Sequence, residues 1–168
     1  MGAPSIPALI LLAIVLAQRL SELVLARRNT ERLLARGGRE VGADHYPLIV
    51  ALHASWLAAL ILFGWQSALV WGWVWAYVVL QVFRVWILAS LGPRWTTRII
   101  VLDEPLVRRG PYRFLPHPNY LLVVAELFVV PMALGLPIVA LIFGLLNLMM
   151  LYVRIGAESK ALREAAGR

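Results

Sequence analysis

Cysteine is absent from this 168-residue sequence, and histidine occurs only three times. Without cysteine the chain can form no disulfide, bind no zinc or iron–sulfur cluster through thiolates, and use no thiol as a nucleophile. The three histidines are too few and too widely separated to predict a metal site. Metal-binding and thiol-dependent functions are therefore not expected.

Charged residues are also scarce, at 15%, whereas apolar residues make up 61% of the chain. Soluble domains typically contain about 45–50% apolar residues. A helix needs about 20 apolar residues to cross a bilayer, so five such helices use roughly 100 residues and leave no room for a separate soluble domain. We therefore predict an all-α fold: a polytopic membrane helical bundle that forms a single integral membrane domain of residues 1–168.

The apolar runs predict about five transmembrane helices. Their expected ranges are residues 6–26, 46–65, 68–91, 120–134 and 137–154. The short gap at residues 64–67 predicts that the second and third helices form a tight antiparallel hairpin. Pro131, Gly135 and Pro137 interrupt the last apolar run, which predicts a second hairpin of two short spans.

The formal net charge of +7 comes from basic residues that are grouped by loop. The first and third loops and the tail contain Arg27, Arg28, Arg32, Arg36, Arg39, Arg94, Arg98, Arg108, Arg109, Arg113, Lys160 and Arg163. The tips of both predicted hairpins carry no charge. Under the positive-inside rule, the N-terminus lies outside, and the basic loops and the C-terminus are cytoplasmic. This pattern favours a bacterial inner (plasma) membrane protein over a nucleic-acid-binding protein.

The third loop, residues 92–120, is too rich in apolar and aromatic side chains to be disordered. Pro111, Pro116 and Pro118 fix three backbone angles within eight residues. We expect a rigid, structured cytoplasmic loop that folds against the ends of the spans and leaves backbone groups free to contact a ligand.

Several charged residues lie within the predicted spans or at their ends. Arg84 and Glu126 are expected to pair across helices, since intramembrane charges face a bundle interior or a cavity. Arg19 and Glu22 are spaced for a local pair. Arg154 and Glu158 are four residues apart and share one helix face, which allows a simple ion pair at a solvated helix end. His53 is expected to be a packed helix residue.

Three motifs occur in order along the second half of the chain. These are Gly110-Pro111-Tyr112, His117-Pro118-Asn119-Tyr120, and the pair Arg154 and Glu158 after two short spans. In this arrangement residues 91–162 resemble the isoprenylcysteine carboxyl methyltransferase family of membrane enzymes. The first loop, with His45-Tyr46-Pro47, looks like a bacterial subgroup of these proteins.

Two positions depart from the family's pattern. Pro116 stands where an arginine usually precedes the histidine, and Ser159 stands where a second acidic residue usually follows Glu158. Arg113 is a candidate to supply the missing cation. Glu158 is left as the single candidate carboxylate of its motif.

The resemblance implies an S-adenosylmethionine-dependent O-methyltransferase. In such an enzyme the cofactor is enclosed by the loop and C-terminal helices at residues 92–162, and a lipophilic acceptor enters from the bilayer. The acceptor is expected to be prenylcysteine-like or alkyl-lipid- or polyketide-like, with a carboxyl or hydroxyl group to be methylated. The resemblance implies cofactor contacts at Thr97, Leu106, Val107, Gly110, Tyr112, His117, Pro118, Asn119, Tyr120 and Glu158.

The same resemblance implies catalytic roles for Arg154 and Glu158, with Arg154 holding the acceptor. The chemistry of the side chains agrees with this. A sulfonium is attracted to aromatic faces such as those of Tyr112 and Tyr120, and a guanidinium is suited to hold an anionic acceptor. An acceptor that is already ionised needs little help from a general base, so positioning has to supply the catalysis.

Other interpretations of these residues remain open. Tyr112 and Tyr120 also suit interfacial anchors, His117 also suits a capping or core residue, and Glu126 also suits the lower cofactor pocket. The alternative function is a small membrane transporter or a lipid-binding membrane protein without catalysis, although the sequence has no internal repeat of the kind transporters often show. A scaffold whose basic loops bind anionic lipid is a further possibility. The sequence predicts no particular oligomeric state.

Overall fold

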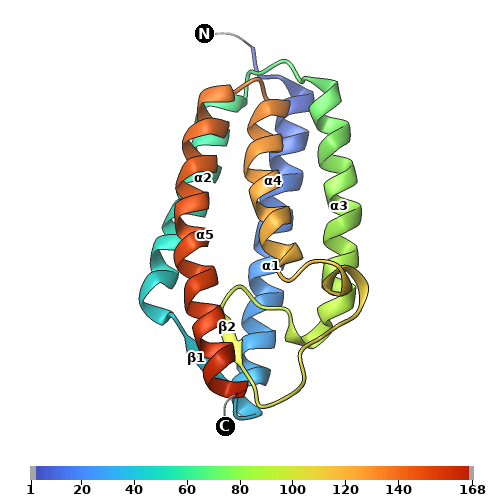
Figure 1. Ribbon diagram of the computed structural model, residues 1–168. Coiled ribbons are helices and arrows are strands. Elements are labelled where there is room, and N and C mark those ends of the chain that lie inside the picture. Colours follow the sequence, from blue (N-terminus) through green and yellow to red (C-terminus); the bar gives the residue numbers. More distant parts are fainter. Residues whose placement is uncertain (1–2, 167–168) are drawn as a thin grey trace.

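The computed structural model describes residues 3–166, except for the side chains of residues 162 and 164–166. The predicted domain's residues 1–2 and 167–168 lie outside this range. The described chain is mostly helical, with α1 (Ile6–Ala35), α2 (Tyr46–Gly64), α3 (Trp71–Leu91), α4 (Pro118–Ala133) and α5 (Pro137–Ala166) running along a common direction (Figure 1). The predicted helical bundle is therefore confirmed.

Four of these helices, α1, α2, α3 and α5, are long and apolar enough to cross a membrane, and α4 is a shorter apolar helix. Many of their outward side chains are apolar and exposed, such as Leu62 at 67%, Val82 at 67% and Ile138 at 71%. Apolar surface on this scale requires lipid around it. The chain is an integral membrane protein.

Prolines mark the starts of several helices, because a proline in the first turn lacks only an N–H that would have no helical partner. Pro47, Pro118 and Pro137 occupy such positions in α2, α4 and α5. Between α4 and α5 the chain turns at Gly135, whose φ of 67° is in the left-handed region. The predicted second hairpin is confirmed, since α4 packs against α5. The expectation of two short spans holds only for α4, because α5 continues as one helix to Ala166.

The first predicted hairpin is wrong. In Figure 1, α2 and α3 lie on opposite sides of α4, and the connection between them crosses one end of the bundle. Backbone hydrogen bonds hold this connection in place: Ser5 N–H donates to Trp65 O at 3.0 Å, and Val70 N–H donates to Ala133 O at 2.9 Å. The connection is therefore anchored to the start of α1 and the end of α4, and α2 packs beside α5 instead.

Helix α1 extends to Ala35, well beyond the predicted span of residues 6–26. Its polar end is held by the third loop. Asn29 is buried and donates from Nδ2 to Trp95 O at 2.8 Å, and the hydroxyls of Thr30 and Thr96 lie 2.6 Å apart. Hydropathy detects only the apolar part of such a helix.

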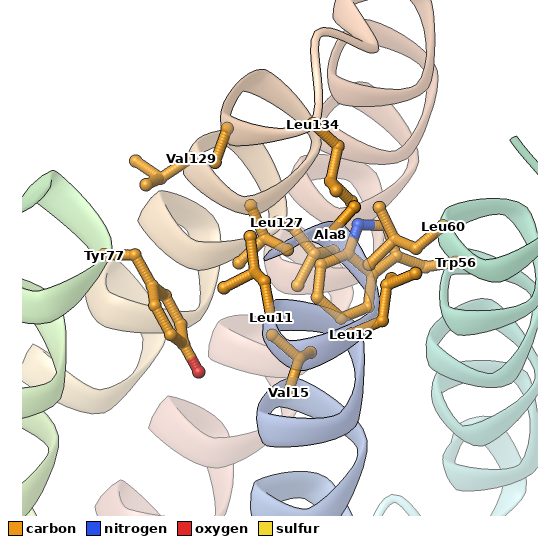
Figure 2. Packing of buried hydrophobic residues seen from close by; sticks show 12 residues of the cluster. Ala8, Leu11, Leu12, Val15, Trp56, Leu60, Tyr77, Leu127, Val129 and Leu134 are labelled. Atoms are coloured by element: carbon orange, nitrogen blue, oxygen red, sulfur yellow. The ribbon is translucent and has the colours of Figure 1, made fainter. Parts of the chain in front are cut away.

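The main apolar core lies in the half of the bundle away from the long loop. Trp56 of α2 is fully buried, and Figure 2 shows it among Leu11, Leu12, Leu60 and Leu127 of the surrounding helices. This packing joins α1, α2 and α4. It fixes the helices whose opposite ends carry the polar residues described below.

The third loop folds against the ends of α1, α3 and α5, as predicted. It also contains a strand that the sequence did not indicate: β2 (Ile99–Val101) pairs antiparallel with β1 (Arg39–Val41) from the first loop, Arg39 facing Val101 and Val41 facing Ile99. Ile99 and Val101 pack on Ala161 of α5. The all-α prediction thus holds for the bundle, and a two-stranded sheet is added at its loop end.

Candidate functional site

Tyr120, at the start of α4, lies between the two charged residues of α5 that share a helix face. Arg154 Nε donates to Tyr120 Oη at 3.0 Å, and Tyr120 Oη donates to Glu158 Oε2 at 2.7 Å. No direct ion pair joins Arg154 to Glu158 among the described residues. The prediction of a shared face holds, but the simple ion pair is replaced by a relay through the phenol.

His117 completes this group. Its ring stacks on that of Tyr120, with centroids 5.3 Å apart and planes 14° apart. Its Nδ1 lies 3.5 Å from Glu158 Oε2. The two aromatic rings of the His117-Pro118-Asn119-Tyr120 motif therefore face one carboxylate on α5.

Arg154 also ties the loop to the helices. Its Nη2 donates to the carbonyl oxygen of Thr97 in the third loop, and the Thr97 hydroxyl lies 3.0 Å from Tyr46 Oη of α2. Arg98 places its guanidinium 4.3 Å from the centre of the Tyr46 ring. Arg154 thus contacts the loop and α4, and Thr97 extends the connection to α2.

A cavity of about 420 Å³ lies between the third loop, the start of α4 and the end of α5. We call it the loop chamber. Of the predicted cofactor positions, those that line it are Leu106, Val107, Tyr112, His117, Asn119, Tyr120 and Glu158. It is also lined by Trp95 and by the cationic side chains of Arg94, Arg98, Arg108 and Arg154. Aromatic faces, the two carboxylates of Glu104 and Glu158, and several guanidinium groups therefore surround one space.

Tyr112 contributes a neutral phenol to the loop chamber. Burial of its ring, and secondarily the nearby charge of Glu158, raises the pKa of Tyr112 well above the ordinary value for tyrosine. The phenol therefore stays protonated at any pH near neutrality. It can offer a hydroxyl donor or a ring face without adding a further negative charge to the site.

Three predicted cofactor positions lie elsewhere. Thr97 lines the neighbouring cavity described next. Gly110, with a φ of 57°, lies so close to α3 that an added Cβ would meet Ser90 Oγ at 2.0 Å. Pro118 is buried at the first position of α4. Neither Gly110 nor Pro118 lines the loop chamber. Both instead determine the backbone conformation, Gly110 where the loop approaches α3 and Pro118 where α4 begins.

A second cavity of about 340 Å³ lies deeper in the bundle, between α1, α2, α4 and α5. We call it the membrane chamber. Its walls are mostly apolar, and its rim includes Leu20 and Leu23 of α1 and Val50 of α2, which are 54%, 47% and 44% exposed. Four residues line both chambers: Trp95, Asn119, Tyr120 and Arg154.

Sequence reasoning missed most of the membrane chamber. The sequence predicts no site role for Trp95 or Asn147, which both line it. His53 lines this chamber, and its Nδ1 lies 2.9 Å from the carbonyl oxygen of Ile49 on its own helix. The only signal in the sequence was the presence of polar residues within apolar runs.

Comparison with known proteins shows the family to which the chain belongs. It matches the isoprenylcysteine carboxyl methyltransferase (ICMT) family over residues 73–164. This chain belongs to the ICMT family. It is also 36% identical over 161 residues to the uncharacterized protein YpbQ of Bacillus subtilis (strain 168), an alignment that covers 92% of this chain and 96% of the relative. No solved structure matches it.

The ICMT family consists of S-adenosylmethionine-dependent methyltransferases, and each motif that carries the resemblance contributes at least one side chain to the walls of the two chambers. The exception is the candidate replacement for the family's arginine. Arg113 is exposed, lies 5.9 Å from the Phe114 ring centre, and lines neither chamber. The structure does not bring Arg113 to the loop chamber, whose guanidinium groups come from Arg94, Arg98, Arg108 and Arg154.

A network of four charges neutralises itself at the membrane chamber: Arg19, Glu22 and Arg84 line the cavity, and Glu126 lies behind them. Arg19 donates to Glu22 at 3.0 Å and to Glu126 at 2.6 Å, and Arg84 contacts Glu126 and lies 3.2 Å from Glu22. The predicted pairs Arg84–Glu126 and Arg19–Glu22 are confirmed as parts of one network. Glu126 is fully buried and lines neither chamber, and Arg84 Nη1 lies 3.5 Å from Asn119 Oδ1 in the shared wall.

Proposed function

We propose that this protein is an S-adenosylmethionine-dependent O-methyltransferase that acts on a carboxyl or hydroxyl oxygen of a lipophilic acceptor. The observation that carries the proposal is the wall shared by the two chambers. A polar and aromatic cavity and an apolar one meet at Tyr120 and Arg154. A water-soluble cofactor and a membrane-soluble acceptor need such a meeting point.

The loop chamber suits the cofactor. Its volume lies within the usual range of small-molecule sites, about 300–1,000 Å³. Glu158 offers a carboxylate to the cofactor's ammonium group, and Arg94, Arg98 and Arg108 offer cations to its carboxylate. The rings of Tyr112 and Tyr120 offer faces to a sulfonium. When bound, S-adenosylmethionine supplies a methyl group that an acceptor oxygen can take.

The membrane chamber suits the acceptor. Leu20, Leu23 and Val50 form an apolar rim that faces lipid, so an alkyl or prenyl chain can enter from the bilayer without crossing water. Arg154 engages the protein through Nε and Nη2. This leaves Nη1 to bind an anionic group at the shared wall. Prenylcysteine-like and alkyl-lipid- or polyketide-like acceptors both match these requirements.

Catalysis in this proposal rests on position. An ionised acceptor needs no base, and holding two reactants in contact at the correct angle supplies a large part of a rate enhancement. Tyr120 is fixed by bonds to Arg154 and Glu158 and by stacking on His117. The phenol therefore keeps the guanidinium and the carboxylate at set positions on either side of the transfer point.

We further propose that the loop end of the bundle is cytoplasmic. The basic side chains of the first and third loops lie at this end, and Trp71 and Trp75 lie at the start of α3 near the other end. Basic loops remain on the cytoplasmic side, and tryptophans mark the membrane interface. In a bacterium, this places the loop chamber where S-adenosylmethionine is made.

The test measures binding and transfer separately. Calorimetry on detergent-solubilised protein is expected to show micromolar binding of S-adenosylmethionine that His117→Ala weakens. Transfer of radiolabelled methyl to a membrane lipid extract is expected for the wild type, and Arg154→Ala should abolish most of it while largely preserving cofactor binding. Absence of cofactor binding by folded wild type contradicts the proposal and favours a transporter or a non-catalytic lipid-binding protein.

A further inference from the structure

A third, open groove of about 480 Å³ is lined by four arginines and adjoins the loop chamber. Arg36 reaches it from the end of α1, Arg94 from the segment after α3, and Arg108 and Arg109 from the third loop. Leu91, Pro93, Pro105 and Val107 complete its walls. None of the sequence motifs accounts for this cluster of like charges. We call it the arginine groove.

One carboxylate organises the groove but does not neutralise it. Glu104 accepts from both Arg36 and Arg94, and Arg94 Nη1 donates to Pro105 O at 2.6 Å. Arg109 Nε donates to Ser90 O at 2.7 Å, which ties the loop to the end of α3. Arg108 has no hydrogen-bond or ion-pair partner among the residues that the structure describes. Four cations thus face one anion.

The position of the groove restricts what can occupy it. It lies at the end of α3, where the loop wraps around the helix (Figure 1). The neighbouring turns of α3 carry exposed apolar side chains, including Val85 at 66% and Trp86 at 43%. These residues belong to a membrane-spanning segment. An anion in the groove therefore lies at the height where α3 leaves the bilayer.

The loop itself has the composition of a segment that touches the membrane surface. Leu106, Phe114 and Leu115 are exposed at 60%, 74% and 43%, and along the chain they lie on either side of Arg108, Arg109 and Arg113. Exposed apolar side chains beside arginines are typical of interfacial segments, in which the apolar groups enter the lipid and the cations bind its phosphates. A free phosphate or a nucleic acid would make no use of these apolar side chains.

We propose that the arginine groove binds the headgroup of an anionic phospholipid. The phosphodiester lies against Arg108 and Arg109, with Arg36 and Arg94 held behind them by Glu104, and an acyl chain runs down the exposed face of α3. Guanidinium groups suit phosphate because they offer paired N–H donors. The groove shares Arg94 and Arg108 with the wall of the proposed cofactor chamber, but binding of a lipid to it can be measured without any activity.

The arginine groove and the loop chamber share part of their walls. Leu91, Arg94, Val107 and Arg108 line both cavities. A phospholipid that orders Arg108 and Val107 on the groove side also orders the wall of the loop chamber. Since coupling between two binding sites is reciprocal, anionic lipid and the ligand of the loop chamber should each strengthen the binding of the other.

The test compares retention of phosphatidylglycerol and phosphatidylcholine by the full-length protein, measured by native mass spectrometry from detergent. We expect the wild type to retain phosphatidylglycerol in preference to phosphatidylcholine. The double variant R108Q/R109Q should retain about tenfold less phosphatidylglycerol than the wild type, because hydrogen bonds between charged groups are stronger than neutral ones. R28Q/R32Q removes the same charge from exposed arginines of α1 outside the groove and should retain the lipid.

Since Arg109 also tethers the loop, R108Q alone provides a variant in which no described contact is lost. It should lower phosphatidylglycerol retention severalfold with an unchanged circular dichroism spectrum. Equal losses in R28Q/R32Q and R108Q/R109Q would overturn the proposal, as would equal retention of the two lipids by wild type. Retention of inorganic phosphate by the wild type without any retention of phosphatidylglycerol would also overturn the proposal, since the ligand would then be a free anion.

Discussion

Tyr120 and Arg154 are separated by 34 positions in the chain, yet Arg154 Nε donates to Tyr120 Oη at 3.0 Å. The guanidinium carbon also lies 5.3 Å from the centre of the tyrosine ring. Both residues line the loop chamber and the membrane chamber. One phenol and one guanidinium therefore form, together with Trp95 and Asn119, the boundary between the two cavities.

Replacing Tyr120 with phenylalanine tests the relay at this boundary. The hydroxyl that links Arg154 to Glu158 is lost, while the ring remains to stack on His117. We expect kcat/KM for methyl transfer to fall about tenfold to hundredfold, corresponding to about 1–3 kcal/mol. Cofactor affinity should change much less. The control is Tyr152→Phe, because Tyr152 is 84% exposed; comparable losses in the two variants would rule out the relay.

The buried network makes a prediction about stability. Glu126 is fully buried and accepts from Arg19, Arg84 and Gln81. Glu126→Gln leaves two buried guanidinium groups short of a counter-ion, which should lower the free energy of unfolding by about 3–5 kcal/mol. Denaturant titration in detergent micelles measures the change.

The matched control is Glu31→Gln. Glu31 pairs with Arg27 at 3.1 Å on the exposed surface of α1, where such pairs contribute about 0–1 kcal/mol. A loss as small for Glu126→Gln as for Glu31→Gln would mean that the buried charges do not stabilise the bundle.

Gly110→Ala tests how the third loop is held against α3. The positive φ disfavours alanine, and the added Cβ would overlap Ser90 Oγ at 2.0 Å. Strain of this type costs about 1–3 kcal/mol, and we expect the loop to shift away from α3 and cofactor affinity to fall about tenfold. Isothermal titration calorimetry checks this. Gly144→Ala on α5 meets nothing within 4 Å and should leave affinity unchanged; an equally unchanged affinity in Gly110→Ala would contradict the proposed role of the close approach.

The raised pKa of Tyr112 predicts an alkaline limit to stability. Burial, followed by the charge of Glu158, disfavours the phenolate in the folded state, so the folded protein binds this proton more tightly than the unfolded chain does. The contribution is fully present below the ordinary tyrosine pKa of about 10 and is lost as the pH rises above it. Tyr112→Phe should therefore flatten part of the alkaline decline in melting temperature. An identical decline in the variant would show that Tyr112 titrates normally.

Local signals predicted the helices well. Prolines at helix starts, together with Gly135, marked the α4–α5 hairpin, because the lack of an N–H acts on the residues next to it. Pro131 did not end its helix and lies inside α4. The spacing of Arg154 and Glu158 likewise placed them on one face. In each case the information lies within a few residues of the feature it determines.

Features that depend on distant contacts were missed. The path from α2 to α3 is set by backbone bonds to Ser5 and Ala133, and β2 exists because β1 pairs with it. The insertion of Tyr120 between Arg154 and Glu158 depends on how α4 packs on α5. Nothing in the immediate sequence neighbourhood of these residues specifies their partners.

The exposed apolar rim at Leu20, Leu23 and Val50 has a kinetic consequence for the proposed reaction. An acceptor that enters through it is drawn from the two-dimensional population of the leaflet, and its methylated product returns there. The rate then follows the acceptor's mole fraction among the surrounding lipids. Adding inert lipid therefore slows the enzyme even when the bulk concentrations of enzyme and acceptor are unchanged.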